Sequence, residues 1–238
     1  MIYKIFLLSL LFICGLIAAC SGGTQPDSDL QIEAAGSQNI PLPAPALGSE
    51  ISLEESLQRR RSVRDYTTEP LELSEISQLL WAAQGITDPS GKRTAPSAGA
   101  LYPLEVYLVV GSAEGLTSGV YKYIPAEHAL TRTLDHDPRK ALSGAALNQS
   151  AVAHAPILIV MSAVFERTTG KYGARGDRYV HMEVGAAAQN IYLQAEALDF
   201  ATCVVGVFLG GISWPESIRL PEELTPLALL PVGHRTVE

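Results

Sequence analysis

The stretch Ala95–Pro103 constrains the fold strongly, because it must separate a helix from a strand. It reads A-P-S-A-G-A-L-Y-P. Its two prolines and its glycine disfavour a regular element through this region. We expect a helix to end near Gln84 and a strand to begin near Leu104. The small residues would let the backbone approach a flat ligand closely, and a tight helix-to-strand connection is the alternative.

The rest of the pattern mixes helices and strands without strict alternation, which favours an α+β domain. Ser52 and Glu55 form a capping-box pattern at the start of the first helix. The apolar run Pro156–Val164 predicts a central strand, and Phe165–Arg178 predicts a polar connection. The expected helices are Leu53–Arg61, Ser74–Gln84, Pro138–Asn148, Tyr179–Asp199 and a short one within Trp214–Leu220. The other expected strands are Leu104–Val110, Val120–Ile124, Leu130–Leu134, Ala201–Leu209 and Leu227–Val232, with a turn at Gly210-Gly211.

The composition indicates one globular domain and argues against several classes of function. The chain has 238 residues, of which 47% are hydrophobic, which is enough for a packed core. The formal net charge of -8 argues against nucleic-acid binding. The three cysteines and five histidines lack the spacing of metal ligands, so no metal site is expected.

The first twenty residues have the features of an export signal. Lys4 provides a positive charge, and Ile5–Ile17 is apolar but shorter than the roughly 20 residues of a membrane-spanning helix. The sequence I-A-A-C that ends at Cys20 resembles the bacterial lipobox, in which the cysteine carries lipid. We therefore expect a signal peptide over residues 1–19 and an exported protein that is lipid-anchored to the bacterial cell envelope. An ordinary secretory signal or a short membrane anchor is the alternative.

The next segment predicts a flexible tether between the lipid and a globular domain. Residues 20–48 are rich in Gly, Pro, Ser and Gln, and alternating prolines near its end favour an extended chain. We expect the folded domain to occupy residues 49–238.

Two groups of side chains are candidates for chemistry. The segment Arg59–Arg64 holds four arginines in an acidic chain, and guanidinium groups bind phosphate oxygens in bidentate fashion. A solvated cluster that complements the helix dipole is the alternative. Lys171 and Tyr172, in the polar connection, could transfer protons or could simply be solvated.

In this order, the motifs resemble those of the FMN-dependent nitroreductase superfamily. The resemblance extends from about Leu53 to Arg235. The loop and the Lys171-Tyr172 pair are similar to the SagB/ThcOx branch, whose members oxidise thiazolines or oxazolines in modified peptides to azoles. The matching segments are Arg60–Arg64, Pro96–Pro103, Val205–Val207 and Leu230–His234.

The resemblance implies a three-layer α-β-α fold with a central mixed, largely antiparallel sheet. It also implies a homodimer that binds FMN between its subunits, with Lys171 and Tyr172 as the catalytic proton-transfer pair. The loop would come from the other subunit and lie along the flavin, and the arginine segment would hold the phosphate and ribityl chain. The implied cofactor-binding residues are Arg60, Arg61, Ser62, Arg64, Ser97, Ala98, Gly99, Gln149, Val205, Gly206 and Arg235.

Three functions remain open on this basis. The first is a lipid-anchored FMN oxidoreductase that acts on a small organic or peptide substrate of the azoline kind. The second is a nitro- or quinone-reductase with a non-nicotinamide electron donor, since the chain is expected outside the cytoplasm and carries no G-x-G-x-x-G fingerprint. The third is a flavin-binding lipoprotein without catalysis.

Overall fold

The computed structural model describes residues 39–206 and 217–236 of the chain. The expected signal peptide, the lipidation site at Cys20 and the first part of the tether lie outside these residues. The elements are β1 (Ile40–Pro41), α1 (Leu53–Arg59), α2 (Leu73–Gln84), the 3-10 helix η1 (Ala98–Ala100), β2 (Leu104–Val110), β3 (Gly119–Ile124), β4 (Ala129–Leu134), α3 (Arg139–Ala145), α4 (Ser150–His154), β5 (Ile157–Ala163), α5 (Glu166–Tyr172), α6 (Arg175–Ala197), β6 (Phe200–Thr202) and β7 (Thr225–His234).

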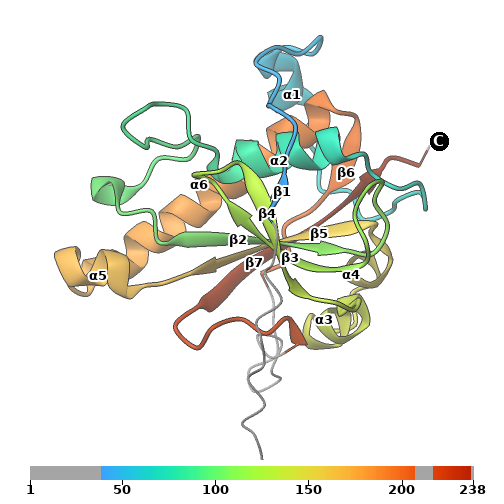
Figure 1. The fold of residues 1–238 in the computed structure, drawn as a ribbon. Coiled ribbons are helices and arrows are strands. Elements are labelled where there is room, and N and C mark those ends of the chain that lie inside the picture. The colour runs from blue at the N-terminus through green and yellow to red at the C-terminus, as the bar shows by residue number, and fades with distance from the viewer. Residues whose placement is uncertain (1–38, 207–216, 237–238) are drawn as a thin grey trace, which may run out of the picture. The chain divides into compact units, whose positions relative to one another are not determined.

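The strands form one sheet in the order β1-β4-β3-β2-β5-β7-β6 (Figure 1). Every strand pair in this order is antiparallel, and a single isolated bridge from Leu71 to Ala113 runs parallel within the described residues. The apolar run predicted as a central strand is β5, which lies between β2 and β7 and is buried along its whole length. The antiparallel part of the predicted topology is therefore confirmed.

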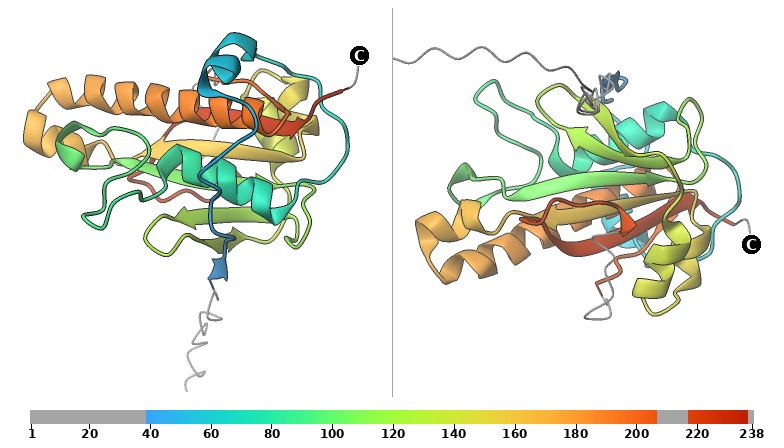
Figure 2. Two further views of the ribbon diagram at one scale, coloured as in Figure 1. Left: turned by 90° about the horizontal axis from the view of Figure 1, so that it is seen from above. Right: turned by 60° about the horizontal axis from the view of Figure 1, so that its bottom comes forward.

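Helices cover both faces of the sheet, as Figures 1 and 2 show. Along β5, Ile157 and Ile159 belong to the core that α2 and α6 close, whereas Leu158 and Val160 belong to the core that α3 and α4 close. This alternation arises because successive side chains of a strand point to opposite faces of the sheet. Since both sets are apolar, helices must pack on both faces. The three-layer α+β architecture predicted from the sequence is confirmed.

The first two helices match the predicted ones closely. The side chain of Ser52 accepts a hydrogen bond of 3.1 Å from the backbone N–H of Glu55, which caps α1 as expected. A capping box between Glu72 and Glu75 starts α2 one residue before the predicted start of the helix.

The helix predicted from Pro138 to Asn148 is shorter in the structure, because α3 ends at Ala145. Leu147 and Asn148 have φ angles of 60° and 57°, in the left-handed region that a continuous right-handed helix excludes. The backbone N–H of Asn148 donates to the carbonyl of Ser143 at 2.8 Å, which closes the end of α3. A short second helix, α4, then begins at Ser150.

The predicted polar connection Phe165–Arg178 is wrong, because most of it is helical. It contains α5 and the first turn of α6, with Gly173 between them at a φ of 59°. A Cβ atom at Gly176 would lie 2.7 Å from Cα of Thr169, so the absent side chain lets the two helices meet closely. Polar surfaces of short exposed helices look like loops in a hydrophobicity pattern, and this accounts for the error.

The last part of the predicted tether belongs to the folded domain. Ile40 and Pro41 pair with β4 as an edge strand, and Leu42 is buried in the core. Both backbone groups of Ala46 bond to the side chain of Gln78 in α2. A run rich in proline can add to a sheet edge, so composition alone did not distinguish it from a linker.

Near the C-terminus the described strands differ in length from the predicted ones. Of the strand predicted at Ala201–Leu209, β6 ends at Thr202 and Val205 makes an isolated bridge to β7. Residues 207–209 of that strand, the turn at Gly210-Gly211 and residues 214–216 of the segment expected to hold a short helix lie outside the described residues. None of the helices in the described ranges is long and apolar enough to cross a membrane.

Candidate functional site

The arginine-rich segment leaves α1 and runs beside the sheet edge. Arg60 caps the helix with a ψ angle of 120°, which turns the chain out of the helical path. The backbone N–H of Val63 then donates to the carbonyl of Thr202 at the end of β6, at 2.9 Å. We call Arg60–Arg64 the basic segment.

Tyr192, on α6, joins the basic segment to the chain that follows β6. Its hydroxyl lies 2.9 Å from the hydroxyl of Ser62 and accepts a 2.9 Å hydrogen bond from the backbone N–H of Val204. The guanidinium of Arg60 lies over its ring, 5.1 Å from the ring centre. The sequence analysis missed Tyr192, because a tyrosine on a helix carries no motif. Through these two hydrogen bonds, Tyr192 brings the basic segment close to the chain just before Val205-Gly206.

The charges of the basic segment are available for an anion. Among the described residues, Arg60, Arg61 and Arg64 form no salt bridge with a carboxylate. In contrast, the predicted phosphate ligand Arg235 pairs with buried Glu196 at 2.7 Å and with Asp199 at 3.4 Å. Arg235 is therefore beside the basic segment, but its charge is already neutralised.

The loop Ala95–Pro103 is folded on itself and holds the expected glycine in a left-handed conformation. The hydroxyl of Ser97 accepts a 2.9 Å hydrogen bond from the backbone N–H of Tyr102. Gly99 has a φ of 63°. A Cβ atom at Gly99 would lie 2.7 Å from Oη of Tyr172 and 2.9 Å from Nζ of Lys171. A side chain here would be strained by the positive φ and would have to displace the ends of Tyr172 and Lys171. The catalytic pair predicted from the sequence therefore lies against the loop of the same chain.

Arg167 fixes the helix that carries this pair. Its guanidinium donates to the carbonyl of Tyr102 at 3.2 Å and pairs with Glu105 on β2 at 2.6 Å. The ring of Tyr172 packs edge-on against Tyr179 of α6, with 5.1 Å between ring centres. These contacts hold α5 between the loop and α6.

A buried polar cluster lies beneath the loop. It consists of Glu183 on α6, Gln84 at the end of α2, and Arg93, and Glu183 is only 3% exposed. Burial raises the pKa of Glu183 to about 7, against the opposing effects of the Ser97 hydroxyl, Arg93 and Gln84. The sequence analysis missed these residues, because a single acidic residue in a helix looks like a solvated surface group.

The two groups of candidate residues lie toward opposite ends of α6 (Figure 2). The loop contacts the N-terminal half through Glu183, and the basic segment contacts the C-terminal half through Tyr192 and Glu196. From Glu183 to Glu196 the helix rises by about 20 Å, at about 1.5 Å per residue. The two groups of candidate residues in one chain are therefore well separated.

Two remaining candidates occupy other positions. Val205 is bridged to Leu229 through both backbone groups, and its side chain is buried on the α3 and α4 side of the sheet. Gly206 follows it and is exposed. Gln149 precedes α4, and its amide donates to the carbonyl of Ala146 at 3.1 Å. The described contacts of Gln149 place it with α3 and not with the basic segment.

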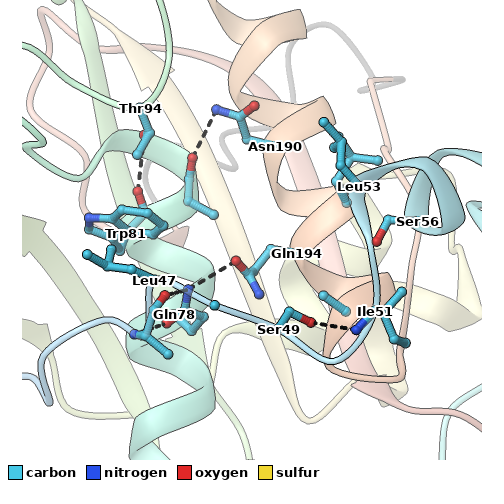
Figure 3. Close-up of a pocket in the computed structure, with 15 residues that line it drawn as sticks. Leu47, Ser49, Ile51, Leu53, Ser56, Gln78, Trp81, Thr94, Asn190 and Gln194 are labelled. Carbon is cyan, nitrogen blue, oxygen red and sulfur yellow. Dashed lines mark hydrogen bonds between the residues drawn. The ribbon is translucent and has the colours of Figure 1, made fainter.

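A groove of about 410 Å³ lies between α2 and α6, beside α1 (Figure 3). Gln78 and Gln194 bond across it at 3.0 Å, and Asn190 donates to the carbonyl of Ala82 at 3.1 Å. Leu53 lines its edge and is 59% exposed. No residue predicted as part of the site lines this groove.

Together, the fold and these two groups of residues define a three-layer α+β protein with a basic segment and a glycine loop toward opposite ends of one long helix. Residues 57–234 match the nitroreductase family. A nitroreductase homologue of Methanocaldococcus jannaschii is 50% identical over 186 residues, which are 78% of this chain and 92% of that protein. The chain therefore belongs to the nitroreductase family of oxidoreductases.

Two further similarities refine this picture. The crystal structure of a nitroreductase homologue from Ralstonia eutropha JMP134 superposes with a TM-score of 0.74 and 29% identity, over 85% of this chain and 92% of that one. The microcin B17-processing protein McbC of Escherichia coli is 34% identical over 136 residues. That match covers 54% of this chain and 49% of McbC, so it spans about half of each protein.

Proposed function

We propose that this protein is an FMN-dependent oxidoreductase of the SagB/ThcOx type that dehydrogenates a small organic or peptide substrate. The observation that carries the proposal is the basic segment, whose arginines Arg60, Arg61 and Arg64 lack carboxylate partners in the described chain. Uncompensated guanidinium groups next to an ordered hydroxyl, here Ser62, suit the phosphate of FMN. The donor set therefore fits the cofactor that the family generally uses.

The flavin site requires a second copy of the chain under this proposal. The loop and the basic segment of one chain lie toward opposite ends of α6, so a homodimer would bring the loop of one subunit to the basic segment of the other. Leu53 and Leu57 on α1 are 59% and 53% exposed, and Leu53 lines the groove between α2 and α6. Exposed leucines next to a hollow surface are the kind of apolar patch that a subunit interface covers.

The chain's own residues would position the substrate and take up a proton. Oxidation of an azoline ring to an azole breaks two C–H bonds, with one hydrogen leaving as hydride and the other as a proton while a ring double bond forms. FMN, when bound, accepts the hydride. Lys171 and Tyr172 present their polar atoms over Gly99, at the surface that would face the ring, and one of them would take the proton.

Reduction of nitro compounds or quinones is the second candidate. The 50% identity to the nitroreductase homologue of Methanocaldococcus jannaschii favours it. The similarity to McbC, a protein that processes microcin B17, favours the first candidate instead. The Lys171-Tyr172 pair beside the loop supports the dehydrogenase, because reduction of a nitro group does not require a base that removes a proton from carbon.

Assays of the purified protein with a thiazoline-containing peptide and with nitroaromatics separate these candidates. The FMN-loaded protein is mixed anaerobically with a thiazoline-containing peptide, and loss of the oxidised flavin absorbance is followed together with the mass of the peptide. We expect the peptide to lose two mass units per ring, and Lys171→Ala and Tyr172→Phe to slow this reaction while flavin stays bound. Lys140→Ala, a change of an exposed lysine on α3, is the matched control. Unchanged turnover in both variants, or turnover of nitroaromatics alone, would contradict the dehydrogenase assignment.

We also propose that the protein works at the bacterial cell envelope. The lipobox-like sequence that ends at Cys20 supports this location. In a bacterial host that expresses the full chain, the protein should appear in the membrane fraction with a lipid mass on its N-terminal cysteine. Cys20→Ala should move it to the soluble fraction, and membrane association that survives this change would contradict lipid anchoring.

A further inference from the structure

The buried polar cluster beneath the loop has no part in the proposed hydride transfer. Glu183 is 3% exposed and Gln84 is fully buried, and both lie where two helices pack against the loop. Buried carboxylates are rare unless they are paired, because water solvates the charge much better than the protein interior does. Arg93 is the nearest cation, yet among the described residues no salt bridge joins it to Glu183.

The cluster contains complementary atoms that are left unpaired. Within the described residues, Oε1 of Glu183, Nε2 of Gln84 and Nε of Arg93 have no hydrogen-bond partner. The oxygen of Glu183 is a hydrogen-bond acceptor, and the nitrogens of Gln84 and Arg93 are donors. Gln84 already accepts a 2.9 Å bond from the guanidinium of Arg93, so the three side chains are in reach of one another. Unpaired buried polar atoms are costly, and a small movement could pair them.

The same cluster holds the loop at both of its ends. The Ser97 hydroxyl lowers the pKa of the Glu183 carboxyl, and it also accepts a hydrogen bond from the backbone N–H of Tyr102. The guanidinium of Arg93 lies 4.5 Å from the centre of the Tyr102 ring, and the backbone N–H of Arg93 donates to the Tyr102 hydroxyl at 3.2 Å. Gly99 lies between these two attachment points.

The charges around the carboxyl are few and come from several elements. On α2 the facing group is the neutral amide of Gln84, and on the connection to β2 it is Arg93. The charges of Glu105 on β2 and Arg167 on α5 have opposite effects on the pKa of Arg93, and the two side chains pair with each other at 2.6 Å. Because burial dominates over Arg93, the pKa of Glu183 is raised to about 7.

We propose that Glu183 is a positioning residue with two states, which sets the conformation of the loop Ala95–Pro103 according to its protonation. As a neutral carboxyl it permits the described arrangement, in which Arg93 stacks on Tyr102. As a carboxylate it pairs with the free donors of Arg93 and Gln84, which draws Arg93 away from the Tyr102 ring and loosens the loop. Its consequence for catalysis rests on the proposed function, in which this loop lies along the flavin and contacts Lys171.

Hydrogen exchange tests this proposal on the full chain without cofactor. Exchange of the amides in residues 95–103, corrected for the intrinsic effect of pH, is measured by mass spectrometry between about pH 5 and 9. We expect protection of the loop to fall with a midpoint near the Glu183 pKa of about 7. Glu183→Gln, which keeps the shape and stays neutral, should keep the loop protected throughout. Glu166→Gln, a change of an exposed glutamate on α5, should behave like the unchanged protein.

A second variant keeps the test independent of one substitution. The Ser97 hydroxyl lowers the pKa of Glu183, so Ser97→Ala should move the midpoint to higher pH. Loop protection that does not depend on pH in the unchanged protein, or an equal pH dependence in Glu183→Gln, would overturn the proposal. A protein that binds no FMN but shows the expected midpoint would overturn the proposed function and leave this inference standing.

Discussion

The hydroxyl of Tyr192 lies 2.9 Å from the hydroxyl of Ser62 and 2.9 Å from the backbone nitrogen of Val204. One buried side chain on α6 therefore ties the basic segment to the chain beyond β6. These two segments are 130 and 12 residues away from Tyr192 in sequence, so the link exists only in the folded chain.

Tyr192→Phe removes both hydrogen bonds and leaves the ring in place. Since a typical hydrogen bond contributes about 0.5–1.5 kcal/mol, we expect a loss of about 1–3 kcal/mol in the free energy of unfolding. FMN affinity should fall as well, because the basic segment loses its support. Urea unfolding and flavin titration measure the two effects. Tyr179→Phe is the control, since no hydrogen bond of the Tyr179 hydroxyl is present in the described chain.

Arg60→Ala and Arg64→Ala should each weaken FMN binding while the fold is preserved. A hydrogen bond to a charged group contributes roughly 1.5–3 kcal/mol, which corresponds to roughly a ten- to hundredfold loss of affinity. Arg59→Ala is the matched control, because Arg59 pairs with Glu55 on the same helix. Equal affinity in all three variants would rule out the basic segment as the phosphate site.

Gly99→Ala should separate the loop from the proton-transfer pair. Its φ of 63° costs a residue with a side chain about 1–2 kcal/mol, and the new Cβ would meet Tyr172 and Lys171. We expect lower stability and a large loss of turnover. Gly144→Ala on α3 is the control, because nothing lies within 4 Å of the added atom. Turnover equal to that of this control would show that the contact is not needed.

The stability of the protein should depend on pH through Glu183. Burial raises its pKa from the ordinary value of 4.5 to about 7, so the unfolded chain releases this proton first as pH rises. The contribution of the neutral carboxyl to the stability of the fold is fully present below about pH 4.5 and is lost as pH rises to about 7. The free energy of unfolding, measured by urea at pH 5 and at pH 8, should therefore fall with pH through this group, and Glu183→Gln should remove that part of the fall. An identical fall in both proteins would mean that Glu183 titrates normally.

The sequence predicted what local patterns determine. The N-cap at Ser52, the central strand β5 and the glycine loop follow from residue spacing and conformational preference, and each is present in the structure. The cluster of arginines indicated the basic segment, and the family resemblance gave the Lys171-Tyr172 pair its predicted role. The contact of this pair with Gly99 links residues that are far apart in sequence, and the structure supplies it.

The missed features depend on burial that no local pattern reports. Tyr192 and Glu183 sit on a helix whose apolar face is made largely of small residues, and their partners come from other elements. Arg235 was predicted as a phosphate ligand from its position, but Glu196 neutralises it. Whether an arginine is free or paired depends on tertiary contacts, which sequence position alone does not report.

The most direct test of the central claim is a visible absorption spectrum of the purified protein after incubation with excess FMN and desalting. We expect a retained flavin band at about one FMN per chain, lost on combined replacement of Arg60 and Arg64 by Ala and kept in Arg59→Ala. A folded protein that leaves the column without flavin would contradict the flavoprotein function. A band that the double replacement does not reduce would contradict the assignment of the basic segment as the phosphate site.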